Sequence, residues 1–457
     1  MSLLRTTATV SRRTAIAAMA AAGVTYAVWP YRPRSLADIP KNRTVLDYWE
    51  KWTGPEGQAV QAVVDRFNQM QDRIWVRRLP VSDIAAKSMV AIGGGDPPDL
   101  VGLFSYNVSQ FAQSGAVMPL DEFKDNDPLG AHHYPSGIWK LLSYNGRQWA
   151  GVNTCYTMAL YYNKQLFRTA GLDPEKPPQT IAELDEFATK MNKHDAQGKL
   201  IRAGFMQTVP DWWPYIWPVL FDGRWYDPTS NQATATDPAN IKAYEWVADY
   251  PKRMGQAAAR SFASGFGRSY FTAQNPFLAN KVGMIIQGPW MANVARLFAP
   301  SFEYGCGPVP IDQGLPDPQV PRGLLEADVI MIPRGCPHPE EAFTFLRYMQ
   351  RPDVQETLAL GHCKSSPMTQ VSPGFSQGHP NPYVAVHDAI AKSPRVQILP
   401  QTRVWPQYAS LLTSAFQGIW EGANPTQRLT AVQQRVQKLI DVAQRRKNQR
   451  QSSGEAM

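Results

Sequence analysis

The sequence is poor in cysteine, and this limits the covalent and metal chemistry that it can support. It has 457 residues and only four cysteines, none of them in a C-x-x-C pattern. Isolated cysteines do not supply the paired ligands of zinc or redox motifs. An oxidising compartment would allow one disulfide, and the spacing does not select the pair among Cys155, Cys306, Cys336 and Cys363.

Signatures of metal-dependent or phosphate chemistry are also lacking. The chain contains no H-E-x-x-H motif, and the neighbouring His132 and His133 point in different directions rather than toward one ion. The run Gly93–Pro98 is interpreted as a turn, because no Lys-Ser/Thr pair follows it. We therefore expect no catalytic residue, no metal site and no cofactor. A glycosidase stays open as an alternative, because its chemistry needs only two carboxylates.

Positive charge is lacking from the body of the chain, although the whole sequence has a net charge of +8. Residues 1–41 hold six Lys/Arg and one acidic residue, and the segment from Lys438 onward holds five bases and two acids. Without these ends the chain is close to neutral. A nucleic-acid-binding protein would need a basic surface on the body, so this class is excluded.

The N-terminus has the pattern of an export signal. Arg12 and Arg13 precede Ala15–Trp29, an uncharged and alanine-rich run that is short for a membrane span. The paired arginines resemble the twin-arginine export motif, with Ala15 and Ile16 where that motif usually has Phe and Leu. We expect an exported protein, in the periplasm or on the outer face of the cytoplasmic membrane, with the signal either cleaved or kept as an anchor. A flexible tail is the alternative.

The length predicts two lobes, since one core of this size is unusual. In the first part, predicted strands and helices alternate, which indicates a parallel sheet. The strands are Thr44–Trp49, Trp75–Leu79 and Asp99–Phe104, and the helices are Gly57–Gln69 and Ile84–Ile92. Farther along, we predict the strands Leu160–Tyr162, Lys281–Ile286 and Leu324–Pro333, a helix over Pro339–Gln350 and two C-terminal helices.

A short α/β segment in the middle of the chain shows particularly clear signals. A helix over Asn163–Ala170 is expected to end at Gly171, and a second helix to begin after Thr180. Thr180 and Glu183 have the spacing of a capping box, in which each side chain bonds a backbone N–H of the other residue. The spacing of apolar residues in the second helix predicts one buried face.

This segment, YYNKQLFRTAGLDPEKPPQTIAELDEFA, resembles the signature of the family 1 extracellular solute-binding proteins, the sugar-binding receptors of bacterial ABC importers. Similar blocks follow the family's order at Leu46–Arg66, Gly93–Phe123, Ala279–Val294 and Ile332–Leu346. The resemblance implies an α/β, two-lobe, periplasmic-binding-protein-like (type II) fold with a hinge and an interlobe cleft.

The same resemblance implies lobes that are discontinuous in sequence. The chain would cross between them near Trp149–Thr154, Ile311–Arg322 and Lys364–Met368. Lobe 1 is expected to comprise residues 42–152 and 321–365, and lobe 2 residues 153–320 and 366–444. Residues 1–41 would be the export signal and linker, and 445–457 a disordered basic and polar tail.

Candidate ligand-binding residues follow from the rule that open parallel sheets bind ligands at the carboxyl ends of their strands. Aromatic and polar residues are mixed there, and both are needed by a sugar, whose C–H faces stack on rings and whose hydroxyls require polar partners. For each Trp the alternative role is packing in the core. For Glu326 and Asp328, the two carboxylates in LLEAD, the alternative role is capping a turn. The candidates at strand ends are Trp49, Trp52, Glu56, Phe104, Ser105, Thr154, Tyr156 and Trp290. Further candidates are Trp213 and Trp217 in a tryptophan-rich run, Glu326 and Asp328 in LLEAD, and Trp405 after a loop-rich region.

Three functional interpretations are compatible with these residues. We expect a monomeric receptor that binds a mono- or oligosaccharide or a polyol between its lobes and delivers it to the permease subunits of an ABC importer. The first alternative is a secreted glycosidase with the same aromatic cleft. The second is a ligand-sensing partner of a membrane signalling protein.

Overall fold

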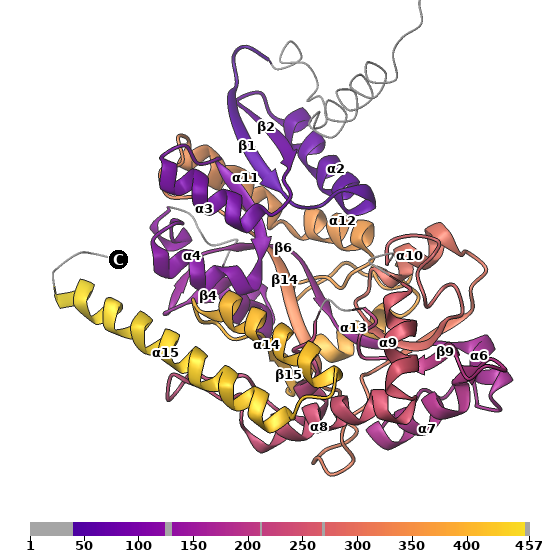
Figure 1. Ribbon diagram of the computed structural model, residues 1–457. Helices are drawn as coiled ribbons and strands as arrows, with labels where there is room; N and C mark the ends of the chain where they lie inside the picture. The colour runs from indigo at the N-terminus through magenta and orange to yellow at the C-terminus, as the bar shows by residue number, and fades with distance from the viewer. Residues whose placement is uncertain (1–39, 124–129, 211–212, 267–269, 453–457) are drawn as a thin grey trace, which may run out of the picture.

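The computed structural model describes residues 40–123, 130–210, 213–266 and 270–452 (Figure 1). The expected export signal lies outside these residues, apart from Pro40 and Lys41. Two sheets organise the described part, and each has its own hydrophobic core. The predicted α/β, two-lobe architecture is therefore confirmed.

The sheet of lobe 1 has six strands, in the order β15-β14-β3-β1-β2, with β6 also pairing with β14. The strands β1, β2 and β3 are parallel, whereas β14 runs antiparallel to β3 and β6. Helices cover both faces of the sheet, and every residue of its central strand β14 is buried. The strands are β1 (Thr44–Glu50), β2 (Ile74–Pro80), β3 (Leu100–Phe104), β6 (Gly151–Thr157), β14 (Gly323–Met331) and β15 (Val396–Ile398).

Two groups of helices surround this sheet. On one face pack α2 (Gly54–Met70), α11 (Pro339–Met349) and α12 (Pro352–His362). On the other face pack α3 (Ile84–Gly94), α4 (Val108–Ser114) and α5 (Ser136–Leu142). Helix α2 follows β1 after a short loop, and α4 follows β3 through the short helix η2 (Ser105–Asn107). The loops at these strand ends consequently meet at one edge of the sheet.

The sheet of lobe 2 has five strands, in the order β13-β7-β12-β9-β8. They are β7 (Ala159–Asn163), β8 (Lys193–His194), β9 (Leu200–Phe205), β12 (Val282–Gln287) and β13 (Tyr304–Gly307). Its helices are α6 (Lys164–Thr169), α7 (Ile181–Met191), α8 (Pro238–Arg253), α9 (Gln256–Ser264) and α10 (Met291–Phe298), and α13 (Val384–Ala391) packs against β6 and β14. The C-terminal helices α14 (Trp405–Trp420) and α15 (Pro425–Ser452) join the same core.

The signals in the central segment are confirmed. Thr180 caps α7, with Glu183 N–H donating to its hydroxyl over 3.2 Å and Thr180 N–H donating to the Glu183 carboxylate over 3.3 Å. Gly171 has a φ of +71°, the left-handed conformation that ends a helix. Asn163 caps α6 by accepting the N–H of Leu166 over 3.0 Å.

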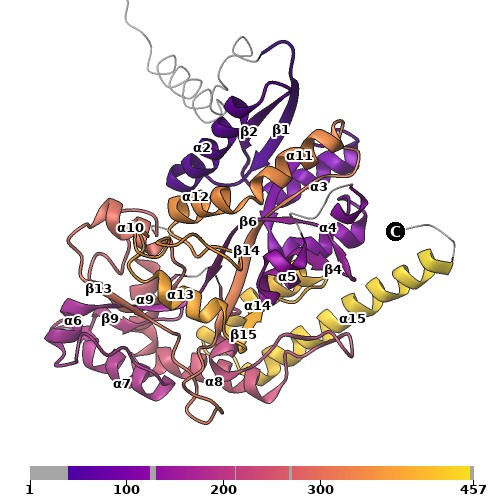
Figure 2. The same ribbon diagram turned by 180° about the vertical axis from the view of Figure 1, so that it is seen from behind.

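The long strands β6 and β14 lie in the middle of the molecule, between the rest of lobe 1 and the elements of lobe 2, as both views show (Figure 2). Every residue of both strands is buried. The structure keeps β6 in the lobe 1 sheet through Thr157, whereas the predicted boundary placed residues from 153 in lobe 2. It also pairs β15 with β14, although 366–444 was assigned to lobe 2. Neither difference has a sequence signal, because strand pairing depends on long-range contacts.

The C-terminal end differs from the expectation of a disordered tail beginning at residue 445. Helix α15 continues to Ser452. After Pro425 this helix contains neither Gly nor Pro, and it is rich in Gln, Arg and Lys, which favour helix. The remaining residues, 453–457, lie outside the described part of the chain.

All four cysteines are buried and free, so no disulfide forms among them. Burial raises the pKa of the Cys155 thiol to about 12, which keeps it protonated and unreactive. Within the described residues, none of the helices combines the length and the apolar character that crossing a bilayer requires.

Candidate ligand-binding site

A cavity of about 450 Å³ lies at the carboxyl ends of β1 and β3 and is lined from both lobes. Its volume is typical of small-molecule sites, which range from about 300 to 1,000 Å³. The β1–α2 loop contributes one wall, and lobe 2 contributes three aromatic residues opposite it. The lining residues are Trp52, Thr53, Gly54, Glu56, Phe104, Tyr156, Trp213, Phe271, Trp290 and Lys364.

The aromatic rings form two groups: Trp52 with Phe104 of lobe 1, and Trp213 and Trp290 of lobe 2 with Tyr156 of β6. Trp52 meets Phe104 edge to face, with ring centroids 6.2 Å apart. On the opposite side, Trp290 lies 5.5 Å from Trp213 and 5.3 Å from Tyr156. The apolar C–H faces of a pyranose ring can each contact an aromatic face, one on either side. Rigid rings also lose little conformational entropy when a ligand binds.

The position of Trp290 depends on the glycine two residues before it. A Cβ atom added to Gly288 would lie 2.1 Å from the Trp290 ring, so only glycine allows the indole to fold back over the chain. The indole N–H donates to Gln287 Oε1 over 3.0 Å, which fixes the orientation of the ring. The sequence Gln-Gly-Pro-Trp thus aims one aromatic plane into the cavity.

Polar groups that can bind hydroxyls are few and well placed. The indole N–H of Trp52 is buried and has no hydrogen-bond partner among the described residues. Glu56 lies in the first turn of α2, where the helix dipole favours a carboxylate. Its Oε1 accepts from Asn293 Nδ2 over 3.5 Å, a contact between the lobes. The Thr53 side chain makes no capping bond and is exposed.

A buried ionic cluster lies beneath the aromatic rings. The carboxylate of Asp328 accepts from Lys364 Nζ over 2.6 Å and from the Thr154 hydroxyl over 2.5 Å, and Lys51 Nζ is 3.3 Å away. Lys51 also lies 3.4 Å from Glu50. Burial acts to raise the pKa of Asp328, but the two ammonium groups outweigh it and hold the pKa below its usual value. Two carboxylates therefore balance two ammonium groups.

The ammonium groups of this cluster also hold the rings above them. Lys51 Nζ is 4.6 Å from the Phe104 centroid, and Lys364 Nζ is 4.9 Å from that of Trp52 and 5.0 Å from that of Tyr156. A desolvated cation over an aromatic face contributes on the order of 2 kcal/mol. The buried charges thus orient the surface that a ligand would contact.

Glu326 is the third buried carboxyl of this region. It accepts a hydrogen bond of 2.5 Å from the Tyr156 hydroxyl. Burial raises the pKa of Glu326 to about 7, although the bond from Tyr156 opposes the shift. Burial, reinforced by Glu326, also raises the pKa of Tyr156 well above its usual value, so the phenol stays a neutral donor.

The structure brings together most of the residues that the sequence nominated. Trp52, Glu56, Phe104, Tyr156, Trp213 and Trp290 line the cavity. Thr154, Glu326 and Asp328 lie in the buried layer behind it. Ser105 is also buried there, where its hydroxyl accepts the N–H of Ala327 over 3.2 Å.

Three nominated tryptophans are absent from the residues that line the cavity. Trp49 packs against the core on the α3 side, because side chains alternate along β1 and Tyr48 occupies the other face. Trp217 is buried against Phe205 and Trp246 in lobe 2. Trp405 is also buried there, beside Tyr215 and Tyr408. For these residues the structure shows core packing, the alternative that applied to every Trp.

Sequence reasoning did not nominate several residues of the site. Lys364 lies at a predicted crossing between the lobes, and Lys51 lies in the loop after the first strand, where Trp52 was nominated. Neither lysine was nominated, because nothing in the local sequence indicates that a lysine will be buried. Phe271 also lines the cavity. The alternation of strands and helices selected the edge of the sheet at which this cavity lies, whereas the residues of the opposing lobe are brought to it by the tertiary structure.

The residues that line the cavity do not include the pair of carboxylates that a glycosidase requires. Glu56 is the one carboxylate among the residues that line the cavity. A G-x-S-x-G pattern does occur at Gly374–Gly378, but it forms an exposed turn that follows no strand, unlike a nucleophile elbow. The described residues also contain no group of three His, Cys, Asp or Glu that could hold a metal ion.

Comparisons with known proteins identify the family and the fold of this chain. The family model described as bacterial extracellular solute-binding protein matches residues 51–356. An sn-glycerol-3-phosphate-binding periplasmic protein from Pectobacterium atrosepticum is 22% identical over 94% of this chain and 97% of its own. A maltotriose-binding protein from Pyrococcus abyssi is 22% identical over 68% of this chain and 64% of its own.

Solved structures are similar over most of their length. The protein CpMnBP1 with mannotriose bound has a TM-score of 0.75 and 25% identity, covering 86% of this chain and 99% of that one. The GacH receptor of Streptomyces glaucescens, described in complex with acarbose, has a TM-score of 0.71 and 19% identity, covering 87% and 99%. These likenesses support the two-lobe fold.

Proposed function

Because this chain belongs to the family of bacterial extracellular solute-binding proteins, we propose that it captures a sugar between its two lobes and delivers it to an ABC importer. The observation that carries the proposal is the cavity lined by Trp52 and Phe104 from one lobe and by Trp213 and Trp290 from the other. The protein would act outside the cytoplasm as a monomer, after export directed by the twin-arginine-like N-terminus.

The ligand class follows from the charges around the cavity. Both ammonium groups near it are already paired with Asp328, and the carboxylate among the lining residues, Glu56, would repel an anion. A phosphate ester would therefore lack a free cationic partner at this site. We assign the cavity to a neutral saccharide, like the mannotriose bound by CpMnBP1, rather than to glycerol 3-phosphate.

Binding would be coupled to closure of the hinge. A ligand that contacts rings of both lobes favours the closed state by the difference between its affinities for the closed and open forms. Changing a population from mostly open to mostly closed takes about 5.5 kcal/mol of such preference. Aromatic stacking on both sides, with hydroxyls bonded to Trp52 and Glu56, supplies interactions that exist only when the lobes meet.

A panel of ligands tests the proposal. Isothermal titration calorimetry would compare mannobiose, mannotriose, maltotriose and glycerol 3-phosphate, and chromatography of the same mixtures would detect hydrolysis. We expect one or more neutral saccharides to bind with one site per chain, without products. Cleavage of a saccharide that disappears in a Glu56→Gln variant would overturn the proposal in favour of a glycosidase. Failure of every saccharide to bind would also overturn it.

A further inference from the structure

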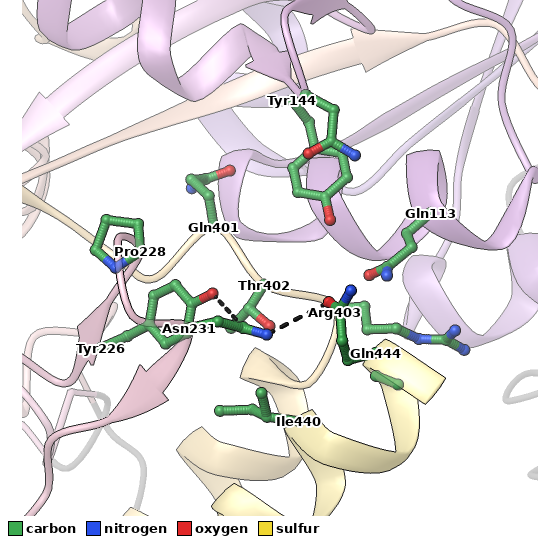
Figure 3. A pocket seen from close by; sticks show the side chains of 12 residues that line it. Gln113, Tyr144, Tyr226, Pro228, Asn231, Gln401, Thr402, Arg403, Ile440 and Gln444 are labelled. Atoms are coloured by element: carbon green, nitrogen blue, oxygen red, sulfur yellow. Dashed lines mark hydrogen bonds between the residues drawn. The ribbon is translucent and has the colours of Figure 1, made fainter. Parts of the chain in front are cut away.

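A second cavity, of about 280 Å³, shares no lining residue with the first (Figure 3). Its walls also come from both lobes. Gln113 of α4 and Tyr144 of β4 (Ser143–Tyr144) belong to lobe 1. The hairpin β10 (Tyr226–Asp227) and β11 (Gln232–Ala233) and the helix α15 belong to lobe 2, and the 401–403 loop leads into α14.

The lobe 2 wall of this cavity is fixed by hydrogen bonds. The Tyr226 hydroxyl donates to Asn231 Oδ1 over 2.7 Å, and Asn231 Nδ2 donates to Gln444 Oε1 over 3.4 Å (Figure 3). About two turns of helix earlier, Gln437 Oε1 accepts the N–H of Ala233 over 3.0 Å. The hairpin and α15 are thus joined into one preorganised surface.

Two polar groups of the 401–403 loop have no hydrogen-bond partner in the described part of the chain. Arg403 is half-buried and makes no hydrogen bond or ion pair with any residue in the described part of the chain. The Oε1 atom of Gln401 is buried and lacks a partner, while the Nε2 of the same amide is held by Leu399 O over 3.2 Å. The lining contains no acidic residue, so Arg403 gives it a positive charge.

We propose that this second cavity binds a small hydroxylated anion. The guanidinium of Arg403 presents a planar fork that suits a carboxylate or a phosphate, and a ligand hydroxyl would donate to Gln401 Oε1. An unpaired buried acceptor is costly, and a ligand donor would remove that cost. The volume corresponds to roughly nine water-sized groups at about 30 Å³ each, the size of a three-carbon hydroxy acid or its phosphate analogue.

The two cavities are linked by the arrangement of the lobes, an inference that rests on the proposed function. An anion that bridges Arg403 and the lobe 1 residues Gln113 and Tyr144 stabilises the arrangement in which aromatic rings of both lobes line the first cavity. Phe104 and Gln113 also belong to the continuous segment from β3 through η2 to α4. Each ligand is therefore expected to tighten the binding of the other by the same factor.

Calorimetric titration with glycerate, glycerol 3-phosphate and neutral glycerol tests the site. We expect at least one of the anions to bind and glycerol not to bind, and the stronger anion identifies carboxylate or phosphate as the preferred group. Arg403→Gln removes the charge at similar length and should weaken binding at least tenfold. Arg260→Gln, a charge-matched change at an exposed residue of α9, should have no effect. Thermal melts would verify that both variants are folded.

Three results would overturn the second site. The first is that no anion binds at millimolar concentration, and the second is that Arg403→Gln binds the anion as tightly as wild type does. The third is that Trp290→Ala abolishes anion binding, because this would place the anion in the first cavity. The coupling is measured separately, by repeating the anion titration with saturating saccharide. Several-fold tightening supports it, and an unchanged affinity refutes it. If no saccharide binds while Arg403-dependent anion binding persists, the proposed function fails and the second site stands.

Discussion

Replacing Lys364 by Met tests the idea that the buried ionic cluster supports the aromatic lining. The change removes one ammonium group from a cluster in which Lys51 and Lys364 balance Glu50 and Asp328. Asp328 loses its 2.6 Å partner, and an uncompensated negative charge remains buried. Breaking a buried ion pair on one side costs about 3–5 kcal/mol. We expect a decrease of that size in the free energy of unfolding.

Urea denaturation followed by tryptophan fluorescence measures this loss, and a double variant controls for it. In Lys364→Met with Asp328→Asn both members of the pair become neutral, so most of the stability should return. Saccharide affinity should stay weakened in both variants, because Trp52 and Tyr156 lose the cation that lies 4.9 and 5.0 Å from their ring centroids. A single variant within 0.5 kcal/mol of wild type, or a double variant less stable than the single one, would refute the reasoning.

Three further predictions concern single residues. In the folded protein the pKa of Glu326 is raised to about 7 from the usual value of about 4.3. Between these two pH values the native state binds more protons than the unfolded state. The free energy of unfolding therefore decreases as the pH rises through this window. Glu326→Gln should remove this decrease and be more stable than wild type at pH 8 by on the order of 3 kcal/mol, and equal pH profiles in chemical denaturation would contradict it. Gly288→Ala should displace the Trp290 ring and weaken saccharide binding at least tenfold, with wild-type calorimetric affinity as the contrary result. Trp405→Phe should lower the melting temperature while leaving saccharide affinity within about twofold, because Trp405 is buried in the lobe 2 core, and a selective loss of affinity would count against that placement.

The sequence was most informative where local rules determine structure. The capping box of Thr180, the end of a helix at Gly171 and the alternation of strands and helices all concern residues close in sequence. The same alternation placed the candidate site at the ends of β1 and β3, where the cavity lies, and so selected Trp52 and Phe104. These predictions required only the geometry of helices and parallel strands.

Residues whose roles depend on distant partners could not be assigned from the sequence. All four tryptophans Trp213, Trp217, Trp290 and Trp405 were candidates for the ligand site because of their residue type. Only the tertiary packing shows that Trp217 and Trp405 lie in the core, whereas Trp213 and Trp290 line the cavity. The pairing of Asp328 with Lys364 joins a residue of β14 to a residue of the loop after α12, 36 positions later in the chain. The strand β15 was likewise settled by its pairing with β14. The length of α15, in contrast, follows from local helix propensity that the expectation of a disordered tail had overlooked.

A crystal structure with the tightest-binding neutral saccharide of the panel tests the central claim most directly. We predict a sugar ring between the two lobes, in van der Waals contact with Trp52 on one side and Trp290 on the other, and with a hydroxyl bonded to Glu56. A saccharide bound elsewhere, or one that contacts a single lobe and leaves these two indoles free, would contradict the account.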